Sequence, residues 1–135
     1  MKRREAREQA FLLIFEMSFR KDSLDEVVET AIQCRDLETD TFMLNLVEQA
    51  RQHKDEVDDI ISRYSTKWKV ERLSAVSYAL IRMAICEILY SQDVPVGVAI
   101  NEAVELAKRY GGDEDAPFVN GVLGAFARDQ SKTAE

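Results

Sequence analysis

The chain has 135 residues, of which 46% are hydrophobic and 32% are charged, and a net charge of −7 at pH 7. This length is typical of one domain that buries a hydrophobic core of its own, and the composition excludes disorder across most of the chain. Only five glycines and two prolines are present, whereas a many-stranded sandwich or barrel turns about every 8–12 residues. We therefore expect an all-α helical bundle of about six or seven helices.

The charge is unevenly distributed along the chain. Residues 1–21 contain six basic and three acidic side chains, while the remainder contains 12 basic and 22 acidic ones. A second, smaller basic block covers residues 63–82, with five basic side chains against one acidic. An acidic protein with a basic end can still bind a polyanion there, so the net charge alone does not exclude a nucleic-acid ligand.

Apolar residues at helical spacing predict a first helix over residues 3–20. Three arginines lie off its polar strip and continue the azimuth of its apolar face: Arg3, Arg4 and Arg7. Arginines in such a position must either lie beyond the edge of the core or be paired. Basic side chains in a first helical turn also oppose the helix dipole, by about 0.3–1 kcal/mol each, which suggests another use for them.

Capping residues predict the next two helices. Ser23 followed by Glu26 has the form of a capping box and starts a helix that runs to about residue 35. Either Thr39 or Asp40 can cap a third helix, which the polar residues 51–55 can kink or break.

The best boundary between two halves is the stretch 65–71. We expect an N-terminal helical subdomain at residues 1–66 and a C-terminal one at 67–129, within one compact domain. Residues 130–135 are expected to form a frayed tail.

Three more helices are predicted in the second half. Residues 72–90 are apolar almost all round, and a helix without a polar face belongs in the middle of a bundle. Pro95 starts the next helix, which ends at Gly111 and Gly112. A last helix runs from Pro117 to about residue 128 with one apolar face.

The sequence offers little support for catalysis or metal binding. His53 is the single histidine and has no clustered cysteine, so a zinc site lacks ligands and a solvated helix histidine is the simpler interpretation. No nucleophile–base pair can be assembled with any specificity. We predict a protein that is not an enzyme, with no catalytic residues, no cofactor and no metal.

The two cysteines and the apolar stretches indicate the cellular compartment of the protein. Cys34 and Cys86 allow at most one disulfide, and Cys86 lies in an apolar run typical of a buried thiol. No secretory segment follows Met1, and the longest apolar stretch, residues 75–90, is too short and too charged to span a bilayer. We expect a protein of the reduced cytoplasm that does not bind membranes.

Recognition of a ligand is the function that remains, and single-stranded nucleic acid is one candidate ligand. Arginine neutralises phosphates, and aromatic rings stack on unpaired bases at about 1–3 kcal/mol per base. The candidates for phosphate contacts are Arg3, Arg4 and Arg7, and the candidates for base stacking are Tyr110 and Phe118. In the alternative interpretation the arginines form a solvated helix end and both aromatic side chains belong to the core.

Four ordered motifs resemble the NusB family of transcription antitermination factors: residues 3–10 (RREAREQA), 80–87 (LIRMAICE), 98–108 (VAINEAVELAK) and 118–123 (FVNGVL). The resemblance covers nearly the whole chain. It implies an all-α fold of two helical subdomains. It also implies a ribosomal small-subunit protein, called NusE in this role, as the partner.

The same resemblance implies a function. The NusB–NusE pair binds the single-stranded boxA element of nascent RNA and helps the transcription elongation complex to pass terminators, notably on ribosomal RNA operons. The family's basic first helix corresponds to Arg3, Arg4 and Arg7, and its RNA-proximal aromatic residues correspond to Tyr110 and Phe118. Four closely matching residues are open to either a structural or a ligand-binding role: Asn101, Glu102, Asn120 and Gly121.

The sequence leaves two alternatives open, one about function and one about oligomeric state. A non-catalytic helical module for protein–protein interaction, with only incidental RNA binding, is the competing hypothesis. Some members of the family are homodimers, so the resemblance also admits self-association.

Overall fold

A computed structural model describes residues 1–19, 23–65, 73–91 and 93–134, with side chains described as far as residue 130. Every regular element in these ranges is a helix, which confirms the predicted all-α fold. The seven helices are α1 (Arg3–Met17), α2 (Leu24–Arg35), α3 (Thr41–Gln52), α4 (Lys54–Tyr64), α5 (Ala75–Tyr90), α6 (Val96–Tyr110) and α7 (Asp115–Ala134).

The helix starts follow the capping residues of the sequence. The Ser23 hydroxyl accepts a hydrogen bond from the Glu26 backbone N–H at 3.2 Å, which is the N-cap contact of a capping box, and it donates to the Glu26 carboxylate at 3.1 Å. Of the two candidates for the α3 cap, Asp40 is the residue whose side chain accepts from the Met43 N–H. The polar stretch after α3 does break the helix, at His53.

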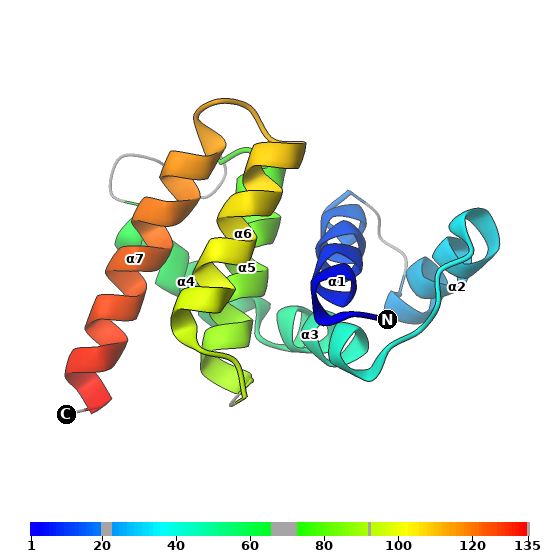
Figure 1. The fold of residues 1–135 in the computed structure, drawn as a ribbon, viewed down its shortest axis with the longest axis horizontal. Coiled ribbons are helices and arrows are strands. Elements are labelled where there is room, and N and C mark those ends of the chain that lie inside the picture. The colour runs from blue at the N-terminus through cyan, green and yellow to red at the C-terminus, as the bar shows by residue number, and fades with distance from the viewer. Residues whose placement is uncertain (20–22, 66–72, 92, 135) are drawn as a thin grey trace.

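Helix α5 lies at the centre of the bundle, as its lack of a polar face predicts. It packs against α1 and α3 on one side and against α4, α6 and α7 on the other, while α2 lies at the outer edge beside α1 (Figure 1). One hydrophobic cluster joins the two predicted halves, since Phe11 and Leu13 of α1 belong to the same core as Leu123 and Phe126 of α7. The predicted boundary near residue 66 lies outside the described residues.

Three polar side chains of α5 are buried, and each has a partner on another helix. Arg82 donates to the backbone carbonyl of Ala50 at 2.7 Å, Ser77 donates to Asp115, and Glu87 accepts from Arg7. Buried polar groups are tolerated in a core when they are hydrogen-bonded in this way. The apolar helix therefore also carries the polar links between the N-terminal and C-terminal helices.

The remaining expectations of the sequence concern single side chains. Cys86 is fully buried, and this burial raises the pKa of its thiol to about 12. His53 is half-buried and stacks on the Tyr90 ring at 4.3 Å, rather than being a solvated histidine within a helix.

Neither a metal centre nor a membrane span emerges where the structure describes the chain. No group of three or more His, Cys, Asp or Glu residues there could hold a metal ion. Among the same residues, no helix has both the length and the apolar character needed to cross a bilayer. Several residues of the two basic blocks lie outside the described ranges: Arg20, Lys21, Lys67, Lys69 and Arg72.

Candidate nucleic-acid interface

The three predicted phosphate-binding arginines occupy three different environments around the start of α1. Arg3 is exposed, and its guanidinium carbon lies 4.1 Å from the ring centroid of Phe42 on α3. A cation over an aromatic face is attracted by the ring, by about 0.5–1 kcal/mol at an exposed site. The contact holds the Arg3 side chain beside α3 and leaves its charge facing solvent.

Arg4 points from α1 toward α6. Its Nε and Nη2 atoms donate to the Glu102 carboxylate at 3.2 Å and 3.1 Å, and its side chain is 77% exposed. The hydrogen bond to Glu102 raises the pKa of Arg4 above its ordinary value. Exposed ion pairs of this kind exchange readily with other ions in solution, so Arg4 is able to leave Glu102 for a phosphate.

Arg7 differs from the prediction that it faces a ligand, because its side chain is only 3% exposed. Its Nε donates to both carboxylate oxygens of Glu87 at 3.0 Å, and Nη2 donates to one of them at 2.5 Å. Glu87 is itself fully buried on α5. The sequence allowed either an exposed or a paired arginine at this position, and the structure shows the paired form, which cannot reach a phosphate while the pair is intact.

Tyr110 lies at the C-terminal end of α6, where it contacts α1. Its ring packs on Phe11 with a centroid distance of 5.2 Å, and the residue as a whole is 38% exposed. Its hydroxyl donates to Glu8 at 2.6 Å. That hydrogen bond is the largest cause that raises the pKa of Tyr110, followed by burial. One part of the ring is therefore fixed to α1, while the rest is open to solvent.

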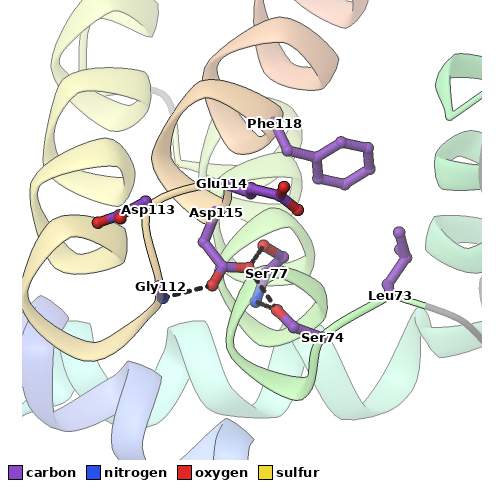
Figure 2. A pocket seen from close by; sticks show the side chains of 8 residues that line it. All are labelled: Leu73, Ser74, Ser77, Gly112, Asp113, Glu114, Asp115 and Phe118. Atoms are coloured by element: carbon purple, nitrogen blue, oxygen red, sulfur yellow. Dashed lines mark hydrogen bonds between the residues drawn. The ribbon is translucent and has the colours of Figure 1, made fainter.

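Phe118 is not beside Tyr110 but lines a separate cleft of about 540 Å³ between α5 and the start of α7. Figure 2 shows its ring pointing toward the Leu73 side of this cleft, while Asp113 points the other way. Phe118 is half-buried and packs on the core. Because Asp113 and Glu114 also line the cleft, this region repels phosphates, and any RNA contact of Phe118 would be with a base.

Asp115 also lines this cleft. Its carboxylate accepts hydrogen bonds from the Ser74 and Ser77 hydroxyls at 2.5 Å each and from the Gly112 N–H at 2.7 Å (Figure 2). Burial acts to raise the pKa of Asp115, but these three hydrogen bonds outweigh it and lower the pKa below its ordinary value. Asp115 thereby ties the start of α7 to the start of α5 and to the end of α6.

Glycine is required at Gly111, next to this network. A Cβ at that position would lie 2.6 Å from the Asp115 carboxylate and 2.9 Å from the Ala107 carbonyl. Because the Asp115 side chain and the Ala107 carbonyl both lie this close to the Gly111 backbone, only a residue without a side chain fits at the end of the helix.

Two residues of the site, Glu8 and Arg109, were not predicted from the sequence, whereas Glu102 was left open to a structural or a ligand-binding role. Glu102 accepts from Arg4, and Glu8 accepts from Tyr110 and, at 2.8 Å, from Arg109. The sequence did contain a signal for the Arg7–Glu87 pair, since Arg7 continues the apolar side of α1, Glu87 lies in the almost wholly apolar α5, and the two charges have opposite signs. The partners of the exposed side chains had no comparable signal, because they come from helices whose relative placement is tertiary.

The sequence model of the NusB family matches residues 4–128. The transcription antitermination protein NusB of Bacillus subtilis (strain 168) is 40% identical over 129 residues, which is 96% of this chain and 97% of that protein. The protein of the same name from Acetivibrio thermocellus is 39% identical over 137 residues, covering 100% of this chain and 94% of its relative.

Solved structures with the same fold include those of NusB proteins. The structure of T. maritima NusB is similar with a TM-score of 0.85 and 33% identity, covering 95% of this chain and 92% of that one. A crystal structure of the antitermination factors NusB and NusE in complex with dsRNA contains a chain with a TM-score of 0.84 and 25% identity, covering 94% of this chain and 96% of its own length.

Proposed function

Because the chain belongs to the NusB family, we propose that it is a transcription antitermination factor that binds boxA-like, single-stranded RNA together with a ribosomal small-subunit protein acting as NusE. Its relatives carry the name of transcription antitermination proteins, and a solved relative is in complex with NusE and dsRNA. Both facts support a binding role in place of an enzymatic one. The role belongs in the cytoplasm, at the transcription elongation complex where nascent RNA emerges.

The observation that carries the proposal is the exposure of three side chains on and beside α1, Arg3, Arg4 and Tyr110, which together we term the cation–aromatic surface. Two exposed arginines at the start of α1 supply positive charge, and the open part of the Tyr110 ring supplies a stacking face. Unpaired bases stack on aromatic rings whatever their sequence, while the phosphates between them attract the arginines. Arg7 is omitted from this surface because it is buried against Glu87.

The charge of the chain favours a role for the partner in RNA affinity. The net charge of −7 repels a polyanion, and two exposed arginines neutralise few phosphates. RNA bound by this chain alone is therefore expected to dissociate readily and to respond steeply to salt. A basic ribosomal protein bound alongside would add phosphate contacts and raise the affinity of the pair.

The test is a fluorescence-anisotropy titration of a labelled boxA-like RNA, with and without the NusE partner, across several salt concentrations. Replacing both exposed arginines (Arg3→Ala with Arg4→Ala) should weaken binding by the pair and reduce the slope of log K against log salt by about 1.4, since each single-strand phosphate contact contributes about 0.7. A double-stranded RNA of the same sequence serves as competitor, and we expect it to compete less well.

The matched control is Arg51→Ala with Arg63→Ala, which removes two exposed arginines from the end of α3 and from α4. This control should leave the salt slope of RNA binding unchanged. Equal effects of the two double variants would show that α1 is not the RNA site. Capture of NusE without any RNA binding by the pair would support the interaction module in place of the antitermination factor.

A further inference from the structure

Glu8 on α1 holds two neighbouring residues of α6 with its two carboxylate oxygens. Oε1 accepts from the Tyr110 hydroxyl at 2.6 Å, and Oε2 accepts from Nη1 of Arg109 at 2.8 Å. The Arg109 guanidinium in turn lies 5.4 Å from the centroid of the Tyr110 ring. One carboxylate thus fixes both a cation and an aromatic ring at the edge of the cation–aromatic surface.

The contact with Glu8 limits the positions that the Tyr110 ring can take. The ring is packed on Phe11 and anchored by its hydroxyl, yet the residue as a whole remains 38% exposed. A stacking face that is ordered before binding costs less conformational entropy when a base stacks on it. The hydrogen bond from Tyr110 to Glu8 therefore favours RNA binding.

The negative charge of Glu8 has the opposite effect on the same ligand. Arg109 is 63% exposed, whereas Glu8 is 20% exposed, so the guanidinium faces solvent while the carboxylate beneath it neutralises its charge. A phosphate that approaches Arg109 competes with Glu8 and is repelled by it. The carboxylate therefore weakens the phosphate contact that Arg109 could otherwise make.

We propose that Glu8 is a positioning residue for RNA binding, whose carboxylate orients the Tyr110 ring for stacking and withholds Arg109 from the phosphates. The inference rests on the proposed function, because it assumes that RNA binds at the cation–aromatic surface. It adds Arg109 to that surface as a latent phosphate contact, and it assigns the level of RNA affinity to a single acidic side chain.

The two effects of Glu8 are separable by substitution. Glu8→Gln keeps an oxygen that accepts from Tyr110 but removes the charge, so RNA should bind a few-fold more tightly, with a salt slope steeper by about 0.7 for one added phosphate contact. Tyr110→Phe keeps the ring but removes its hydroxyl, so RNA should bind a few-fold more weakly with an unchanged slope. Glu8→Ala loses both functions and should combine the steeper slope with weaker binding than Glu8→Gln.

A matched control removes the same charge elsewhere. Glu48→Gln also frees an arginine, since Glu48 accepts hydrogen bonds from Arg51 on α3. It should change neither the affinity nor the salt slope. All variants are measured with the intact chain and the same labelled boxA-like RNA, and thermal melting verifies that each is folded.

The outcomes distinguish this inference from the proposed function. Tyr110→Ala, which removes the ring, should weaken RNA binding more than Tyr110→Phe. If Tyr110→Ala weakens binding while Glu8→Gln and Tyr110→Phe both behave as the wild type, the role of Glu8 is refuted and the RNA surface stands. An unchanged slope in Glu8→Gln likewise refutes the withholding of Arg109. If Tyr110→Ala and the Arg3/Arg4 double variant both bind RNA with the affinity of the wild type, the proposed RNA surface is refuted.

Discussion

Arg4 and Arg7 lie one turn apart on α1, and each forms a bidentate contact with a glutamate from the C-terminal half of the chain. Arg7 and its partner Glu87 are 3% and 0% exposed, while Arg4 and its partner Glu102 are 77% and 19% exposed. In the buried pair neither charge can be left alone, because water does not reach it. In the exposed pair water replaces either partner, so Arg4 is free to bind another anion. The same two residue types thus give a structural link at one position and an exchangeable contact at the next.

The strongest test of this difference removes the buried arginine. Arg7→Ala leaves the Glu87 carboxylate buried without a counter-charge, which should lower the free energy of unfolding by about 3–5 kcal/mol. Urea denaturation followed by circular dichroism measures it. A loss below about 1 kcal/mol would show that water reaches Glu87.

A double replacement serves as the control for that variant. Arg7→Met combined with Glu87→Leu fills the same space with apolar side chains and leaves no unpaired charge. Replacing a buried ion pair in this way is often neutral or stabilising. The double variant should therefore regain most of the stability that Arg7→Ala loses.

Asp115 represents an intermediate case, a half-buried carboxylate whose partners among the described residues are three uncharged hydrogen-bond donors. Asp115→Asn should cost about 1–3 kcal/mol at neutral pH, because hydrogen bonds to a charged acceptor are lost. The lowered pKa of Asp115 in the folded chain sets the pH dependence. The stabilisation is present above the ordinary carboxylate pKa near 4 and is lost as the pH falls through the folded value.

Denaturation of the wild type and of Asp115→Asn from pH 7 to pH 2 measures this effect. The difference in stability between the two proteins should shrink as the solution becomes acidic. A difference that stays constant over the whole range would mean that the charge of Asp115 contributes nothing.

Two glycines test the packing around Asp115 without changing a charge. Gly111→Ala brings a Cβ within 2.9 Å of both Asp115 and the Ala107 carbonyl and should destabilise the chain by about 1–3 kcal/mol. Gly121→Ala meets nothing within 4 Å in α7 and should stabilise it by about 0.5–1 kcal/mol, because alanine is the better helix former. Thermal unfolding of the two variants should therefore shift in opposite directions, and a shift of both in the same direction would contradict the packing argument.

The smallest effect on stability is expected at the exposed pair. Arg4→Ala and Glu102→Ala should each leave the unfolding midpoint where it is in the wild type, since water solvates the remaining charge. Arg4→Ala should nevertheless weaken RNA binding at low salt. A clear loss of stability in either variant would mean that the exposed pair is also structural.

Much of the fold was predictable because local patterns determine where helices form. The cap at Ser23, the apolar face of α1 and the apolar circumference of α5 correctly indicated a helix start, a buried face and the central helix. The last helix was predicted less well. It starts at Asp115, two residues before Pro117, and continues to Ala134 beyond the predicted end near residue 128. The sequence did not indicate a helix start at Asp115, because the hydrogen-bond partners of its side chain, Ser74 and Ser77, lie some forty positions earlier in the chain.

The site was less predictable than the fold. The sequence grouped Arg3, Arg4 and Arg7 as equivalent cations at one end of a helix. The structure separates them into a cation over Phe42, an exchangeable pair with Glu102 and a buried pair with Glu87. Helical periodicity predicts the direction in which a side chain leaves its own helix. It does not predict which residues of other helices lie in that direction.

The sequence by itself determined the all-α class, most helix starts, the central position of α5 and the resemblance to the NusB family, because spacing, caps and motifs are local properties. Only the tertiary structure decided which charges are buried, which are paired and which face solvent. Those properties depend on side chains brought together from helices far apart in the chain, such as Glu8 with Arg109 and Tyr110. Burial and pairing are therefore set by the packing of the helices and not by the sequence of any one of them.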